Sequence, residues 1–288
     1  MVLRLLLGVA EAMYFVAGFA ALADLAPPGR AGEALSYNSL ALYVGIATGP
    51  IIGEALLNSG GFPLVWAGAG VLLAVAALLA ARVPETLQPA SGPSPPAPLL
   101  HPAALVPGLG LFIGVAAVGG FLAFGSLHAD HLGLDLWSPV LGLFGLVVVA
   151  CRVLFATLPD RVPPLRLAAA ALGASGAGLL LVAAVPVVWS LFAGAALLGV
   201  GTAFLTPAVF AAIFSRVPPS QRGSAAGTAS VFIDLGFSGG PVILGLVAAA
   251  SSIPVAFLTA AVLAAAGVVL LASRPIPRAP VPAGPDAG

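Results

Sequence analysis

The sequence predicts an all-α membrane protein, and three observations support this fold class. Hydrophobic residues make up 60% of the 288 residues and charged residues only 7%, whereas soluble domains carry about 25% charged residues. The apolar residues form unbroken blocks of about 20 residues, the length of helix that crosses a hydrocarbon core. One stretch of the chain is also repeated at a fixed distance. Membrane β-barrels show short alternating strands instead, so we predict a bundle of membrane helices.

The apolar blocks predict nine transmembrane helices, three before a proline-rich segment and six after it. The first block contains Arg4 and Glu11 and is longer than the core of a signal peptide, so we interpret it as a span. The predicted spans lie near residues 3–25, 35–57, 62–82, 104–126, 137–158, 166–185, 188–213, 224–249 and 253–272.

These spans divide the chain into two helix groups. Residues 1–82 form the first group and residues 104–273 the second. Residues 83–103 between them are rich in proline and have little apolar surface, so they are predicted to be a linker. Residues 274–288 are predicted to be a disordered tail on the same side of the membrane as this linker.

The repeat relates the end of the first group to the end of the second. Residues 26–53 and 217–244 align without a gap, and the prolines set the distance: Pro27 with Pro218 and Pro50 with Pro241 are each 191 positions apart. Farther along, Pro63 pairs with Pro254 at the same distance. Repetition of this kind indicates a duplicated structural unit.

The distribution of arginine predicts the orientation of the chain. Basic residues stay preferentially on the cytoplasmic side of membrane proteins. Eight arginines fall at span ends on one side, whereas the loops on the other side contain none. These eight are Arg30, Arg82, Arg161, Arg166, Arg216, Arg222, Arg274 and Arg278. The C-terminus is therefore predicted to lie in the cytoplasm and the protein in the cell membrane, with Met1 on the outer side.

Three short motifs stand out. In the first span, Arg4 is followed four residues later by Gly8. In the second span, a glycine recurs at every fourth position and a proline follows the second glycine. This set is Gly45, Gly49, Pro50 and Gly53. Asp160 and Arg161 form an Asp-Arg pair in a loop of the second group.

These motifs resemble the major facilitator superfamily of transporters. The first resembles the family's fourth-helix motif, although Leu7 stands where a glutamine is usual. The second resembles the fifth-helix motif of the family's antiporters, with Glu54 replacing a final glycine. Asp160 and Arg161 resemble the family's cytoplasmic loop motif without its glycines. The resemblance implies two six-helix bundles related by pseudo-symmetry and joined by a cytoplasmic loop.

The resemblance also implies that helices are missing from this sequence. The 191-residue offset matches the three spans of the first group to the last three of the second. The counterparts of residues 104–185 would then lie before Met1, about 90 residues that form three spans. We therefore expect the last three helices of an N-terminal bundle followed by a complete C-terminal bundle.

Two charged residues of the first span are candidates for proton coupling. A charge at the centre of a membrane helix costs about 2.5–3.5 kcal/mol on insertion scales, so Glu11 needs a partner or a cavity. Arg4 lies nearly two helical turns earlier on the same face. The resemblance implies that the motif arginine takes part in proton coupling in antiporters. Alternatively, Arg4 extends to the outer interface and Glu11 forms a helix contact.

Asp234 and Arg152 are the candidates in the second group. Asp234 lies mid-span with Ser230 and Ser238 one turn to either side, while Gly236 and Gly240 fall on the opposite face. Asp234 is therefore a candidate proton acceptor and donor, or it forms a structural hydrogen bond. Arg152 could pair with a carboxylate or an anionic substrate, or extend toward the cytoplasm.

The glycines are predicted to mediate helix packing. Gly45, Gly49 and Gly53 with Pro50 form one smooth face, and Gly236, Gly240 and Pro241 form the related face of the second copy. By family analogy, the second face is expected to pack against a helix of the first bundle. The alternative for the first face is plain membrane packing without a role in transport.

The segment from His128 to Asp135 is predicted to be a solvated outer loop. It contains His128, Asp130, His131 and Asp135 but no recognised spacing of metal ligands. The sequence also lacks a constellation of nucleophile, base and metal, and its net charge is zero. We therefore predict no enzyme activity, no cofactor, no metal and no nucleic-acid partner.

Taken with the resemblance, the sequence predicts a secondary transporter that couples export of small molecules or drugs to protons by alternating access. The partners are then a small-molecule substrate, protons and the lipid bilayer. Two alternatives remain open. One is an importer or symporter of sugars or organic acids, and the other is a non-transporting fragment or sensor on the same fold.

Overall fold

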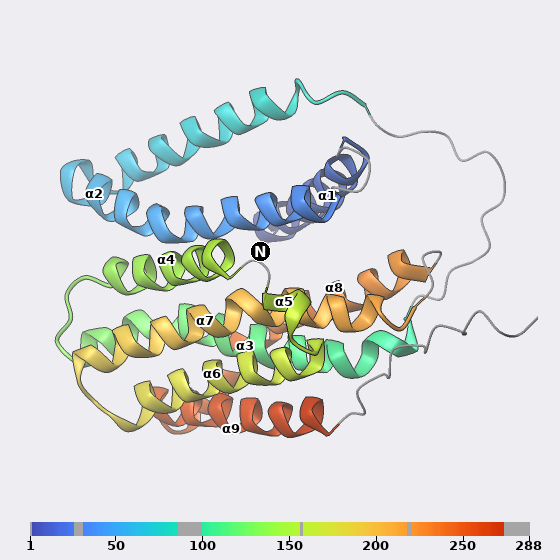
Figure 1. The fold of residues 1–288 in the computed structure, drawn as a ribbon. Coiled ribbons are helices and arrows are strands. Elements are labelled where there is room, and N and C mark those ends of the chain that lie inside the picture. The colour runs from blue at the N-terminus through green and yellow to red at the C-terminus, as the bar shows by residue number, and fades with distance from the viewer. Residues whose placement is uncertain (1, 26–30, 86–99, 156–157, 218–220, 274–288) are drawn as a thin grey trace, which may run out of the picture. The chain divides into compact units, whose positions relative to one another are not determined.

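The computed structural model describes residues 2–25, 31–85, 100–155, 158–217 and 221–273. Within these ranges every regular element is a helix. The chain divides into two compact units, Met1–Pro96 and Ala97–Gly288, called here the first and second units. Their boundary falls inside the proline-rich segment 83–103, of which residues 86–99 lie outside the described ranges, as does the tail from residue 274. Figure 1 traces the helices of both units.

The first unit consists of α1 (Val2–Leu25) and α2 (Ala31–Ala80). Helix α2 is interrupted at Gly61, whose backbone has φ 68° and ψ −171°, a region that essentially only glycine occupies. Pro63, two residues later, offers no backbone N–H to the helix. At the repeat distance Gly61 corresponds to Ser252, which separates two helices of the second unit. The interruption therefore recurs at equivalent positions in the two units.

The second unit is a bundle of helices. These are α3 (Pro102–His131), α4 (Ser138–Leu154), the one-turn α5 (Leu158–Arg161), α6 (Pro164–Ala184), α7 (Val188–Phe214), α8 (Arg222–Ala250) and α9 (Ile253–Ala272). Helices α3, α4, α6 and α9 each have a proline in the first turn, where its missing N–H costs nothing. Helix α3 packs most extensively on α8, while α6 packs on α7 and α9 and α4 packs on α7.

Small residues let the helices of the second unit approach closely. A Cβ added at Gly178 of α6 would lie 2.7 Å from the carbonyl oxygen of Gly194 on α7. One added at Gly176 would lie 2.9 Å from the Cβ of Ala264 on α9. Lipid tails are as apolar as leucine, so membrane helices associate through close packing rather than through the hydrophobic effect. These glycines therefore stabilise the bundle by allowing α6 to pack closely on α7 and α9.

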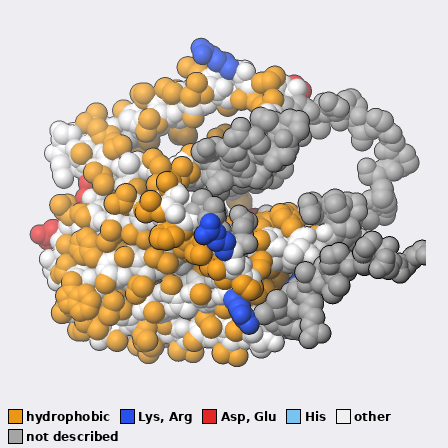
Figure 2. Space-filling model, viewed as in Figure 1, with side chains coloured by type: hydrophobic (Ala, Val, Ile, Leu, Met, Phe, Trp, Pro, Cys, Tyr) orange, Lys and Arg blue, Asp and Glu red, His pale blue; other side chains and the backbone are white. Residues whose placement is uncertain are grey.

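By length and composition, six described helices could cross a membrane. They run over residues 40–80, 102–131, 164–184, 188–214, 224–250 and 253–272. Helix α4 is apolar but has only 17 residues, because the helix expected near 137–158 ends at Leu154. Figure 2 shows that hydrophobic side chains cover the visible face. The fold is thus helical and suited to a membrane, whereas the predicted count of nine spans stays a prediction.

Candidate functional site

Helix α8 carries the candidate Asp234 and has two different faces. Ser230, Asp234 and Ser238 are exposed, whereas Gly236 and Gly240 are buried. Of the most apolar stretch of α8, 17% is buried, against 61% for α3. The side of α8 that bears Asp234 therefore faces away from the core of the second unit. A residue that exchanges protons or contacts a substrate has to be accessible in this way.

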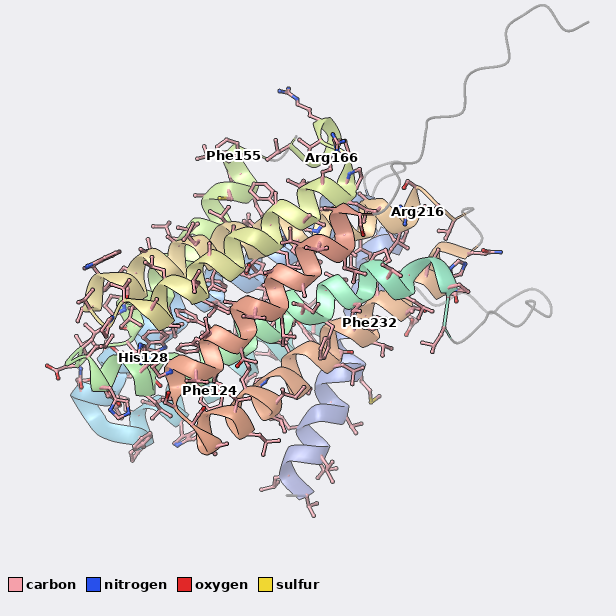
Figure 3. The ribbon with its side chains drawn as sticks, turned by 90° about the horizontal axis from the view of Figure 1, so that it is seen from below. Phe124, His128, Phe155, Arg166, Arg216 and Phe232 are labelled. Carbon is pink, nitrogen blue, oxygen red and sulfur yellow. The ribbon has the colours of Figure 1, made fainter. Side chains whose placement is uncertain are left out.

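The glycine face of α8 packs on α3. A Cβ at Gly240 would lie 2.5 Å from the Cα of Ala116, and one at Gly236 would lie 2.9 Å from the Cβ of Val115 and 3.0 Å from the carbonyl oxygen of Phe112. The expectation that this face packs against a helix of the first bundle is wrong, because the space beside both glycines is filled by α3. Phe232 contacts the same helix one turn earlier, beside Gly108 (Figure 3).

Neighbouring residues extend this contact along the whole pair of helices. The ring of Pro241 lies 3.3 Å from the position of an added Cβ at Gly119. The buried Leu244 fills the space beside Gly120. Because glycines lie on both helices, the two backbones approach closely and leave no space for a larger side chain at these positions. Helix α8 is thereby held in one position, which fixes where Asp234 lies on the surface of the second unit.

A hydrogen-bond cluster fixes the start of α8. The backbone N–H of His101 donates to Oγ1 of Thr228 (2.8 Å), and the N–H of Ala103 donates to Nδ1 of His101 (3.2 Å). Since Nδ1 accepts, the ring proton lies on Nε2, which donates to Oε1 of Gln221 (2.9 Å). His101 therefore caps α3 and joins it to α8. The sequence signal was a polar residue directly before Pro102, at the cap position of a helix.

The first copy of the glycine motif lies on α2. A Cβ added at Gly45, Gly49 or Gly53 would meet no atom of another described element within 4 Å. Pro50 lies inside the helix. Among the residues of the first unit whose burial is described, none is buried. The motif is thus present on one helix face, but no described residue of the first unit packs against it.

The remaining candidates lie on three separate helices. Arg4 and Glu11 are seven residues apart on α1, and their side chains lie outside the described residues, so their pairing stays a prediction. Arg152 lies half-buried in the last turn of α4. Arg161 is exposed on α5, and the side chain of Asp160 lies outside the described residues. No described contact brings these candidates together at one point.

The prediction of a solvated loop is wrong for His128. Helix α3 continues to His131 and ends before Gly133, whose φ of 77° suits glycine. Asp130, His131 and Asp135 are exposed as expected, but His128 is only 4% exposed. It lies seven residues after the fully buried Phe121, so helical periodicity could have placed it in the core. Among the described residues, no group of three potential ligands could hold a metal ion.

The charged ends of the second unit are distinct. Figure 3 shows Arg166 and Arg216 at one end of the bundle and His128 at the other. Arg166 begins α6 and Arg216 follows α7. The loops at the end that holds His128 contain no arginine. The described part of the second unit therefore keeps its arginines at one end, as the charge pattern predicted.

The family model described as Major Facilitator Superfamily matches residues 1–187 and again residues 140–287. The chain belongs to this superfamily. An uncharacterised MFS-type transporter of Burkholderia mallei (strain SAVP1) is 32% identical over 279 residues, covering 93% of this chain and 65% of its own length. One of Salmonella typhimurium (strain LT2) is 31% identical over 275 residues, covering 93% of this chain and 69% of its own.

Membership of the major facilitator superfamily agrees with the prediction that the protein is not an enzyme, since the similar proteins are named as transporters. The chain spans less than two thirds of the length of the Burkholderia relative. The long apolar helices of the structure also agree with a multi-pass membrane protein.

Proposed function

We propose that this chain forms the larger part of a proton-coupled exporter of small molecules or drugs that works by alternating access. The observation that carries the direction of transport is the glycine-proline motif of Gly45, Gly49 and Pro50 on α2, which resembles the motif of the family's antiporters. Two bundles would rock around a central site, and protonation of a carboxylate would bias the equilibrium between their two arrangements.

Asp234 is the carboxylate proposed to bind and release the proton. Its exposure on α8 supports this role, because the rigid contact of the opposite face with α3 keeps it at one position. Arg4 and Glu11 on α1 are proposed as its counterpart in the other bundle, and Arg152 as a contact for an anionic group. Intramembrane charged residues are costly and are found chiefly where they function.

Nine membrane helices are proposed, with the C-terminus in the cytoplasm of a cell-membrane protein. The interruption of α2 at Gly61, which corresponds to Ser252 between α8 and α9, supports two spans within α2. Helices α1 and α4 would supply two more beside the other helices that are long and apolar enough. The arginines at one end of the second unit support the orientation.

Three further helices are proposed to precede α1 in the complete transporter. The repeat pairs α2 with α8 and α9, so α3, α4 and α6 have no counterpart in the first unit. The greater length of the Burkholderia relative supports this proposal. The coding sequence upstream of Met1 tests it: an in-frame extension that encodes apolar helices would support it, and a stop codon there would contradict it.

The function is tested by proton-driven efflux in cells. Asp234→Asn removes the titratable proton and keeps the shape of the side chain, and Arg4→Ala removes the motif arginine. Both variants, made in the complete transporter, are expected to lose drug resistance and efflux without a loss of membrane abundance. Glu85→Gln, at an exposed carboxylate in the segment after α2, is the matched control and is expected to keep both.

Efflux that survives both substitutions would contradict the proton-relay assignment. An absence of transport by the complete protein under any gradient would instead favour a sensor or a fragment. Accumulation of substrate in place of its loss would favour an importer or symporter.

A further inference from the structure

The buried His128 has an unusual environment for a polar side chain. Its ring packs edge-on against Phe257 of α9, with ring centroids 5.7 Å apart and planes at 80°. Phe257 in turn contacts Phe121 (6.2 Å), which contacts Trp137 before α4 (5.3 Å). The backbone of Val182, near the end of α6, also lies beside the ring, and this contact favours the protonated form. His128 therefore lies where the C-terminal ends of α3 and α6 meet the start of α9.

Neither ring nitrogen of His128 has a hydrogen-bond partner of acceptable geometry among the residues that the structure describes. A neutral imidazole can occupy such a place at the cost of one unmade donor and one unmade acceptor hydrogen bond. An imidazolium cannot, because it has two donors and a full charge to bury. The packed arrangement therefore favours the neutral ring, because the desolvation of a charge there outweighs the contact with Val182.

We propose that His128 is a proton-binding site that controls the contact between the ends of α3 and α9. In the neutral form the ring fills the space beside Phe257. When it binds a proton, it leaves this space for water, and the aromatic contacts of Phe257 with Phe121 and of Phe121 with Trp137 loosen. The proposal concerns the second unit alone and does not depend on the direction of transport or on Asp234.

Apart from the backbone of Val182, the described groups around His128 offer no partner for the charge inside the core. Helix α9 contains no titratable residue, and the only one of α6 is Arg166, in its first turn at the other end. On its own helix and the following loop, His128 has Asp130, His131 and Asp135, all of them exposed. The charge on His131 opposes a second charge nearby, whereas the two carboxylates would favour it.

A protonated ring that moves outward would find a favourable place. His128 and His131 lie in the last turn of α3, where the free carbonyl groups of a helix attract cations. Asp130 and Asp135 are exposed at the same end. The two states are therefore a buried neutral ring and a cation at the helix end near two carboxylates, and pH decides between them.

Trp137 provides a direct reporter of this change. The chain has three tryptophans, Trp66, Trp137 and Trp189, so replacing Trp66 and Trp189 by phenylalanine leaves Trp137 alone. We expect its emission to shift to longer wavelength, and its quenching by acrylamide to increase, when the purified full chain in nanodiscs is taken from about pH 8 to about pH 5, the range over which histidine changes charge. The change should reverse when the pH is restored.

His128→Phe keeps the aromatic contact but cannot bind a proton, so the spectrum of Trp137 is expected to be the same at both pH values. His131→Phe removes the exposed histidine three residues later and is the matched control, which is expected to keep the full shift. His128→Leu, a smaller apolar side chain, should also abolish the shift and serves if the phenylalanine does not fit.

Hydrogen exchange provides a second readout. After correction for the intrinsic effect of pH, the protection of residues 253–260 at the start of α9 should fall on acidification in the parent protein and stay constant in His128→Phe. A Trp137 shift that persists in both His128 variants would overturn the proposal. An unchanged spectrum and unchanged protection in the parent protein over the same range would overturn it equally.

Discussion

The two copies of the repeated segment carry the same motif in different surroundings. In α8, Gly236, Gly240 and Pro241 lie against α3, so closely that an added Cβ at Gly240 would lie 2.5 Å from the Cα of Ala116. In α2, a Cβ added at the equivalent Gly45 or Gly49 would have no such neighbour within 4 Å among the described residues. The motif therefore encodes a surface that admits a close neighbour, and it does not by itself determine whether that neighbour is present.

The copies also differ at the position of the carboxylate. Asp234 of α8 corresponds to Tyr43 of α2. Gly45, Gly49 and Pro50 correspond to Gly236, Gly240 and Pro241, whereas Gly53 corresponds to Leu244. The identical residues include those that a close helix contact needs, and the residue with acid–base chemistry is among those that differ. This division supports a structural role for the glycines and a separate, local role for Asp234.

The largest expected difference between the copies concerns their central glycine. Gly240→Leu forces a side chain against the backbone of α3, which cannot move without displacing the helix, and should cost about 3 kcal/mol of stability. Gly49→Leu in the same chain should cost nothing measurable. The free energy of unfolding by SDS titration in mixed micelles distinguishes them. Equal losses would mean that the first copy is packed as tightly as the second.

This comparison becomes sharper in the complete transporter. If a helix equivalent to α3 precedes α1, Gly49→Leu should become destabilising there while remaining neutral in the present chain. Gly240→Leu should be equally harmful in both. A neutral Gly49→Leu in the longer protein would count against the proposed additional helices.

The next largest effect is expected where each copy ends. Gly61→Ala places a Cβ on a backbone of φ 68° and ψ −171° and should cost about 2 kcal/mol. The equivalent Ser252 has φ −162°, an extended backbone that any residue adopts, and its side chain makes no cap hydrogen bond, so Ser252→Ala should be neutral. Thermal unfolding followed by circular dichroism measures both. Equal stability of the two variants would show that α2 can run through residue 61 without an interruption.

The smallest effect is expected for threonine hydroxyls in the two copies. Thr228→Val leaves the buried backbone N–H of His101 without its acceptor and should cost about 1 kcal/mol. Thr48→Val removes a hydroxyl that bonds only to the carbonyl of Val44 in its own exposed helix turn and should leave stability unchanged. The same SDS titration resolves the two. If Thr48→Val lowered the free energy of unfolding as much as Thr228→Val, the Thr228 hydroxyl would not be more important for stability than the exposed Thr48 hydroxyl.

Helical periodicity predicted part of the site correctly. The separation of Ser230, Asp234 and Ser238 from Gly236 and Gly240 follows from about 100° of rotation per residue, and the structure places the two sets on exposed and buried faces. Periodicity did not reveal which helix the glycines contact. They were assigned to another bundle, whereas α3 of the same unit covers them.

The histidines show a different limit of the sequence. His128 is surrounded in the sequence by Asp130, His131 and Asp135, and this polarity predicted a solvated loop. Its burial depends on Phe257, 129 positions later, and on α6, which no local pattern connects to it. His101 was likewise missed, because Thr228 and Gln221 are distant in the sequence.

The sequence by itself determined that the chain is helical, apolar and internally repeated, and that it belongs with membrane transporters of one superfamily. The first two properties follow from composition and from the length of the apolar blocks, the third from comparing segments 191 positions apart, and the family from short motifs. All of these can be read along the chain without knowing which helices meet. Only the tertiary structure decided that α8 lies on α3, that the first copy of the motif has no described neighbour in its unit, and that His128 is buried. Each of these depends on which surfaces meet, and small residues permit a close contact without specifying its partner.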